Sequence, residues 1–274
     1  MSSAAPPSPL AAPGPWDLVS SAYATEVVPT FEPFAREALR LAAPPSGSRI
    51  VDVACGPGTL AALASGHGLR VDALDFSPRM IQQLVARSLP GVTAHTGDGQ
   101  ALPFADGTFA AGFSLFGLMF FPDRARGFAE LRRVLQSGAR AVVSSWPPVE
   151  SAPVLAPMFA ALRTEMGVLL GGQAPPERVE MPLSSEEACR AEMGAAFAGV
   201  EVHRFATTQR APSADALWES IARTMAPIVL MQKMLGEERW AGPARAARQA
   251  IVDVVGSGPV EMELTALVSV GVAG

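Results

Sequence analysis

The sequence has little of the residue types through which proteins bind polyanions. Lys233 is the only lysine among 21 lysines and arginines, and the formal net charge is -5. No basic run interrupts this acidic balance. Nucleic acids and acidic membrane surfaces attract proteins through clustered positive charge. We therefore expect no nucleic-acid partner and no membrane partner.

Cysteine and long apolar runs are also scarce. The two cysteines, Cys55 and Cys189, are far apart and form neither a zinc-type spacing nor a disulfide framework. No uninterrupted apolar run reaches the ~18–20 residues that span a bilayer. Residues 1–15 are rich in Ala, Pro and Ser but lack the order of a secretory signal. We predict a flexible N-terminal arm over 1–15 and a cytoplasmic protein.

Histidine is too sparse to suggest a metal centre. His67, His95 and His203 stand alone in the sequence, and no pair has the spacing of metal ligands. We therefore predict no metal. None of the three lies in a pattern that identifies a general base, so the catalytic residues stay unassigned.

Apolar residues are abundant, since 49% of the chain is hydrophobic and 17% is charged. Such a composition supports a packed core. Between residues 49 and 146, short apolar strands alternate with helices, which is typical of a parallel sheet with right-handed crossovers. The expected strands are 49–54, 70–74, 92–96, 109–115 and 139–145.

The rhythm changes after Trp146, where helical patterns dominate. Neither an internal repeat nor a linker is evident, so we predict one domain over 16–274. Its expected parts are a helical lid (16–48), a cofactor-binding core (49–146), a helical cap (147–196) and C-terminal strands and helices (197–274). In this last part we expect strands at 200–207 and 260–272 and helices at 214–234 and 237–255.

The most informative segment is VDVACGPGTL, residues 51–60, in which a strand runs through a glycine turn into a helix. Gly56 and Gly58 allow a ligand to approach the backbone closely. The free amides at the start of the following helix attract an anionic group. With Ala61, the turn also satisfies the dinucleotide-binding pattern G-x-G-x-x-G/A.

Acidic residues follow the next two strands. Asp75 ends the second strand and can accept hydrogen bonds from both hydroxyls of a ribose, while Phe76 and Met80 can flank an adenine ring. After the third strand comes GDGQ, residues 97–100, whose carboxylate can accept a bond from an adenine amino group. Because parallel strands end at one edge of a sheet, these groups point to a nucleoside-binding site there.

Three segments resemble motifs of a known family. VDVACGPGTLA, LDFSPRMI and GDGQALPFADGTFAAGFSLFGLMFFPD are similar to motifs one to four of class I S-adenosylmethionine-dependent methyltransferases, closest in style to the small-molecule group. The resemblance covers residues 16–146. It implies an α/β, Rossmann-like, doubly wound sheet of seven strands with the last antiparallel, an N-terminal helical lid and a helical cap inserted after strand five.

The resemblance also implies a function. S-adenosyl-L-methionine would be the cofactor, and a small, fairly apolar molecule would accept the methyl group, mainly through proximity and orientation. The implied cofactor-binding residues are Tyr23, Asp52, Ala54, Gly56, Pro57, Gly58, Asp75, Phe76, Met80, Gly97, Asp98, Gly99, Gln100 and Ser114. The predicted substrate-binding residues are Tyr23, Phe116, Met119, Phe120 and Trp146. We expect a monomer or a homodimer.

The sequence departs from the family pattern at two positions. Ala54 stands where the family usually has glycine, and Phe109-Ala110 replaces the common Phe-Asp at the start of strand four. No general base is recognisable, which favours an acceptor that is already nucleophilic, such as a carboxylate, an acidic phenol, an amine or an activated carbon. Methylation of oxygen is slightly preferred over carbon or nitrogen.

Other functions remain open at this point. The glycine pattern permits an NAD(P)-dependent oxidoreductase, but the short-chain types need a Tyr-x-x-x-Lys pair, and Lys233 has no tyrosine partner. Methyltransferases acting on nucleic-acid amino groups carry an Asn/Asp-Pro-Pro-aromatic run where this chain has Ser114-Leu115-Phe116-Gly117. A catalytically silent cofactor-binding module of the same fold is a further alternative.

Overall fold

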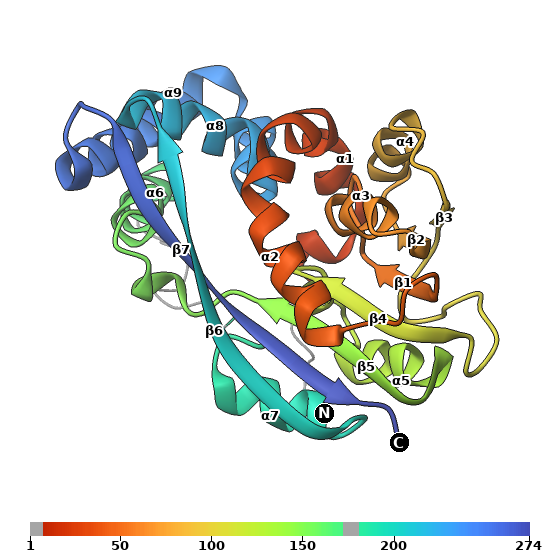
Figure 1. The fold of residues 1–274 in the computed structure, drawn as a ribbon. Helices are drawn as coiled ribbons and strands as arrows, with labels where there is room; N and C mark the ends of the chain where they lie inside the picture. Colours follow the sequence, from red (N-terminus) through yellow and green to blue (C-terminus); the bar gives the residue numbers. More distant parts are fainter. Residues whose placement is uncertain (1–7, 172–180) are drawn as a thin grey trace, which may run out of the picture.

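A sheet of seven strands in the order β3-β2-β1-β4-β5-β7-β6 organises the chain. The computed structural model describes residues 8–171 and 181–274 (Figure 1). Strands β1 to β5 run parallel, while β7 is antiparallel to both β5 and β6. This confirms the predicted topology. The strands are β1 (Arg49–Val53), β2 (Arg70–Asp75), β3 (Val92–Thr96), β4 (Phe109–Leu115), β5 (Leu135–Ser145), β6 (Ala198–Ala211) and β7 (Val260–Val272).

Helices connect and cover these strands. In the described residues, none of them combines the length and hydropathy needed to cross a bilayer. The α-helices are α1 (Pro13–Ala22), α2 (Val28–Ala42), α3 (Thr59–Gly66), α4 (Pro78–Ala86), α5 (Arg124–Val134), α6 (Leu155–Leu169), α7 (Glu186–Gly194), α8 (Ala214–Thr224) and α9 (Ala226–Val255). Short helical turns are η1 (Pro9–Ala11), η2 (Tyr23–Val27), η3 (Leu118–Phe120) and η4 (Val149–Ser151).

Apolar layers cover both faces of the sheet. Ile50 and Phe113 face the layer formed by α2, α3 and α4, where they pack with Phe34. Val51 and Leu131 belong to the opposite layer, which α5 and α7 cover. Successive residues of a strand point to opposite faces, so strands covered on both sides read as unbroken apolar runs.

The expected cap over 147–196 does not form one unit. Helix α7 covers the sheet beside β6 and β7, whereas α6 packs with α8 and α9 around a separate core (Figure 1). The cause is the length of the last two strands. Strand β7 pairs with β5 only from Leu267 onward. The residues of β7 before Leu267 pair with β6 alone, and their side chains need other helices to cover them. Val260 and Met262 bury their side chains in this third core. Residues 172–180 of the expected cap lie outside the described residues.

Two helix boundaries also differ from expectation. Helical structure begins within the predicted arm, because the Trp16 indole donates to the Leu10 carbonyl at 2.9 Å and ties η1 to α1. Pro29 lies in the first turn of α2, where a missing N–H costs little. The helix expected over 214–234 ends at Thr224, whereas the expected break at Gly236 is confirmed, because its φ of 74° and ψ of 167° are not helical and divide α9 into two helical segments.

The two-sided burial of the sheet leads to a stability prediction. Leu131 of α5 is 1% exposed, so Leu131→Ala should lower the free energy of unfolding by about 2–5 kcal/mol. Val85 of α4 is 60% exposed, and Val85→Ala serves as the control, with an expected change within about 0.5 kcal/mol. Urea unfolding measures both. Equal small losses would show that α5 is not packed against the sheet.

Candidate functional site

The turn between β1 and α3 forms the floor of the site. Gly56 and Gly58 adopt positive φ values of 54° and 82°, which glycine accepts without a steric cost. A Cβ on Gly58 would lie 2.3 Å from Leu84 Cδ1, so this glycine is required by packing. A Cβ on Gly56 would meet nothing within 4 Å, because this residue borders an open cavity. No side chain caps α3, so the amides of its first turn are not capped from within the chain.

Asp75, at the end of β2, ties this turn to the neighbouring helix. Its carboxylate oxygens accept bonds from the Gly56 amide at 2.9 Å and from the Ser77 amide at 2.8 Å. Burial raises the pKa of Asp75 to about 6. The two hydrogen bonds act against this rise, and the charge of the nearby Asp17 adds to it. Each oxygen retains a lone pair, so the carboxylate can still accept bonds from a ligand.

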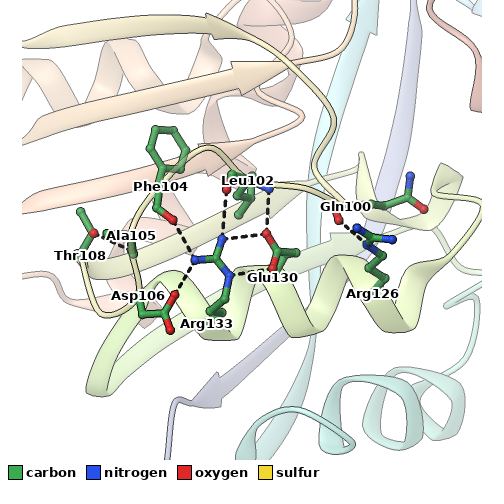
Figure 2. Close-up of polar contacts among 9 residues, drawn as sticks. All are labelled: Gln100, Leu102, Phe104, Ala105, Asp106, Thr108, Arg126, Glu130 and Arg133. Carbon is green, nitrogen blue, oxygen red and sulfur yellow. Dashed lines mark hydrogen bonds and ion pairs between the residues drawn. The ribbon is translucent and has the colours of Figure 1, made fainter.

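The loop between β3 and β4 is anchored to α5. The Arg133 guanidinium donates to the Leu102 carbonyl at 3.0 Å and to Glu130, whose carboxylate accepts a bond from the Leu102 amide at 2.8 Å (Figure 2). One turn before Glu130 on α5, the Nε atom of Arg126 donates to the Gln100 carbonyl at 2.7 Å. Figure 2 shows the loop held along one side of the helix by these groups. The anchoring fixes the part of the loop that reaches the cavity.

Asp98 and Gln100 stand at the cavity end of this loop. The Asp98 carboxylate is exposed and accepts bonds from the Gln100 amide at 2.8 Å and from its side-chain nitrogen at 3.0 Å. The Gln100 side-chain oxygen accepts a bond from the Asp123 amide at 2.8 Å. A Cβ on Gly99 would lie 2.4 Å from Phe121 Cζ, so only glycine fits the close packing of the loop. Asp98 therefore keeps acceptor capacity facing the cavity.

Asp52 is a buried carboxyl group without a full set of partners. It is 2% exposed, and its Oδ2 atom has no hydrogen-bond partner among the residues that the structure describes. Burial and the neighbouring Asp75 carboxylate raise the pKa of Asp52 to about 8. A buried, unpaired polar atom is costly unless a ligand or water satisfies it. Its position is therefore suited to a hydrogen-bond donor or a cation.

The N-terminal helices cover the site from above. Asp17 of α1 accepts bonds from the Ser77 hydroxyl at 2.6 Å and from the Arg79 amide at 3.1 Å, and so joins α1 to the start of α4. Tyr23 begins the π-helical turn η2 and borders both cavities described below. Burial and the Asp75 charge raise the pKa of its phenol well above the usual value. The hydroxyl therefore stays protonated and can donate a hydrogen bond.

Two cavities meet at the glycine turn. The larger encloses about 240 Å³ and the smaller about 50 Å³. Predicted site residues that line the larger cavity are Tyr23, Ala54, Gly56, Asp75, Phe76, Met80, Gly97, Asp98, Gly99, Gln100, Phe116 and Phe120. Those that line the smaller one are Tyr23, Asp52, Ala54, Gly56, Pro57 and Phe116.

Four residues expected at the site lie outside the lining of both cavities. Gly58 and Ser114 are buried behind it, and Met119 is 2% exposed in the layer beneath α5. Trp146 stacks on the Phe116 ring, with ring centroids 4.1 Å apart. It belongs to an aromatic cluster with Phe31, Phe34 and Phe205, and its contact with substrate stays a prediction.

Two residues beside the turn have a strained backbone. Ala54 and Phe116 have φ values of 57° and 59°, which non-glycine residues rarely adopt. A Cβ on Gly117 would lie 2.3 Å from the Ala54 Cβ, so Gly117 makes room for the methyl group that departs from the family pattern. Strain of this kind concentrates at functional sites. Here it brings the Phe116 ring and the Ala54 methyl group to both cavities.

Sequence reasoning missed several lining residues. Leu115 borders both cavities, and Trp16, Phe31 and Phe121 each border one of them. Leu115 had a signal, because it ends β4 at the same sheet edge as the glycine turn. Trp16 and Phe31 had none, since their positions depend on how the N-terminal helices fold back over the sheet.

The three histidines do not line either cavity. His95, on β3, places its Nε2 atom 2.9 Å from the Oδ1 atom of Asp72, which lies on β2. Within residues 8–171 and 181–274, no group of three or more His, Cys, Asp or Glu side chains is arranged to hold a metal. The site therefore offers acidic acceptors, turn amides and aromatic walls, an arrangement that can hold a nucleoside bearing a positively charged group.

Comparisons with known proteins agree with this geometry. Residues 50–138 match the protein family described as Methyltransferase domain. Over 122 residues, the chain is 40% identical to a demethylmenaquinone methyltransferase of Corynebacterium kroppenstedtii, a match that covers 44% of this chain and 50% of that protein. The chain thus spans about half the length of the curated relatives it matches.

Solved structures show the same fold over most of the chain. The YcgJ protein of Bacillus subtilis is 17% identical, with a TM-score of 0.56 and coverage of 87% of this chain and 97% of that one. Phosphoethanolamine N-methyltransferase 2 of Haemonchus contortus, solved with phosphomonomethylethanolamine and S-adenosylhomocysteine, is 16% identical. Its TM-score is 0.55, with coverage of 92% of this chain and 56% of that one.

The buried carboxyl groups lead to a prediction for the protein without ligand. The pKa of Asp52 is about 8 when folded, against about 3.9 for an ordinary aspartate. Between these values the folded chain retains a proton that the unfolded chain has lost. The free energy of unfolding should therefore fall as the pH rises through this window. Asp52→Asn should remove about 1.4 kcal/mol per pH unit of that slope between pH ~5 and ~7.

Urea unfolding at several pH values measures this slope. Asp253→Asn, which changes a carboxylate far from the cavities on α9, is the control and should leave the slope unchanged. If wild type and Asp52→Asn lose stability in parallel as the pH rises, the raised pKa of Asp52 is disproved.

Proposed function

We propose that this chain, whose residues 50–138 match a methyltransferase domain, transfers a methyl group from S-adenosyl-L-methionine to a small, fairly apolar molecule. The observation that carries the proposal is the convergence of three strand ends on one cavity. The glycine turn after β1, Asp75 at the end of β2 and Asp98 after β3 all line it. These groups match an amino-acid end, a ribose and an adenine in that order.

The residues of the site fit this cofactor. Asp75 would accept hydrogen bonds from the ribose hydroxyls, and Asp98 would accept one from the adenine amino group. The adenine ring would lie between Phe76 and Met80. The unpaired oxygen of buried Asp52 borders the smaller cavity and would accept a bond from the cofactor's ammonium group. An incoming positive charge would also lower the raised pKa values of Asp52 and Asp75.

The wall chemistry supports an apolar acceptor. Among the described residues that line the two cavities, the charged ones are Asp52, Asp75 and Asp98, and no lysine, arginine or histidine is present. Leu115, Phe116 and other apolar side chains form most of the remaining wall. Apolar walls suit a ring better than a small carboxylate, so we prefer an acidic phenol or an activated carbon. The relatives named demethylmenaquinone methyltransferases are consistent with a small-molecule acceptor.

Catalysis would rest on orientation in a dry site. When bound, S-adenosyl-L-methionine supplies a methyl group already activated by a sulfonium. The turn and Asp75 would fix the position of the ligand, while Tyr23 and the N-terminal helices would exclude water. A phenol that is acidic enough loses its proton without help from the protein, which favours oxygen as the methylated atom when the described lining offers no histidine or lysine as a base.

Binding and transfer measurements test this function. Calorimetry should detect S-adenosylhomocysteine but not NADH, and labelled cofactor should transfer its methyl group to a member of a phenol and quinol library. Binding of NADH alone would instead support the oxidoreductase alternative. Binding of S-adenosylhomocysteine with no transfer to any acceptor would support a catalytically silent module of the same fold.

Asp75→Asn tests the site assignment. The amide keeps the size of the carboxylate but presents an NH₂ group to donors, so cofactor binding should weaken by about 1–3 kcal/mol. Asp253→Asn again serves as the control and should bind like wild type. An unchanged dissociation constant for S-adenosylhomocysteine in Asp75→Asn would remove this residue from the site.

A further inference from the structure

We infer that Arg87 is a positioning residue for the cofactor, because it holds the glycine turn from behind and orients the amides that face the amino-acid end of the ligand. This inference rests on the proposed function. Arg87 follows helix α4 and lines neither cavity, so its role is indirect and acts through the backbone of the turn.

The contacts of Arg87 are with two consecutive carbonyl groups. Its Nη1 atom donates to the Pro57 carbonyl and to the Gly58 carbonyl, both at 2.9 Å. The same helix contributes Leu84, whose Cδ1 atom would lie 2.3 Å from a Cβ on Gly58. Helix α4 therefore supports the turn at two points, one apolar and one charged.

Holding a carbonyl also orients the amide on the other side of the same peptide bond. In a trans peptide, C=O and N–H point in opposite directions. The bond from Arg87 to the Gly58 carbonyl thus directs the Thr59 N–H away from Arg87, and Thr59 borders the smaller cavity together with Asp52. On the near side, Asp75 accepts a bond from the Gly56 amide. The turn is held between an acid in front and a guanidinium behind.

The charge of Arg87 is not neutralised by an acid. Burial alone lowers its pKa, and no carboxylate in the described part of the chain contributes to that shift. Its positive charge lies beside the N-terminal turn of α3, where the helix dipole is already positive. The side chain is exposed and solvent screens part of its charge, but the placement still adds to the positive potential at the turn and so favours an anion there. The carboxylate of the cofactor's amino-acid end has the required charge.

The two halves of the cofactor distinguish positioning from a general structural role. Adenosine carries the ribose and adenine but lacks the amino-acid end, so its binding should not depend on Arg87. Calorimetry with S-adenosylhomocysteine and with adenosine should therefore be run on Arg87→Gln, Arg87→Lys and the wild type. Arg70→Ala is the control, because Arg70 is an exposed arginine at the start of β2.

Arg87→Gln should bind S-adenosylhomocysteine about tenfold more weakly, while its affinity for adenosine stays within about twofold. Arg87→Lys should recover most of the loss, because one nitrogen makes both bonds in the wild type and an ammonium can do the same. The control should match wild type with both ligands.

The remaining outcomes overturn the inference. Equal losses for both ligands would show a general structural role, and unchanged binding of both would show no role. If neither arginine variant folds, the residue is structural and the inference fails. A wild type that binds adenosine but not S-adenosylhomocysteine would contradict the proposed function itself, which separates that failure from the failure of the inference.

Discussion

The carboxylate of Asp75 is the interaction on which the site depends. It joins three elements, because it ends β2, accepts the Gly56 amide of the turn after β1 and accepts the Ser77 amide at the start of α4. Asp17 of α1 is bonded to the same Ser77 through its hydroxyl, so the N-terminal cover is attached to the same point. The floor, one wall and the cover of the cavity are therefore fixed relative to one another through one buried acid.

Without a ligand, the ionisable groups around the site lack partners of opposite charge among the described residues. Asp52 and Asp75 are both buried, and burial together with their mutual repulsion raises the pKa of Asp52 to about 8. Behind the turn, Arg87 carries a positive charge that no acid of residues 8–171 and 181–274 neutralises. A ligand with an ammonium or sulfonium on the acidic side and a carboxylate on the turn side would relieve both. The proposed cofactor carries these charges in that order.

Local patterns made the sheet and much of the site predictable. The glycine turn, Asp75 and Asp98 could be placed together because each lies at or just after the end of a strand, and parallel strands end at one edge. Ala54 was noted as a departure, and the structure accounts for it through a strained backbone and the space left by Gly117.

Features that depend on packing over long sequence distances could not be predicted. The pairing of Asp17 with Ser77 spans 60 positions, and nothing near either residue signals it. The stacking of Trp146 on Phe116 and its packing against Phe34 of α2 also depend on distant elements, while its contact with substrate stays a prediction. The division of the cap follows from the first residues of β7, which pair with β6 alone and need their own cover, and local propensity does not reveal this pairing.

A crystal structure of the chain with S-adenosylhomocysteine tests the central claim most directly. The account predicts the ribose on Asp75, the adenine edge at Asp98 and the amino-acid end over the glycine turn, with its ammonium within hydrogen-bond distance of Asp52. A nucleoside bound elsewhere, or bound in this cavity with its ribose away from Asp75, would contradict it.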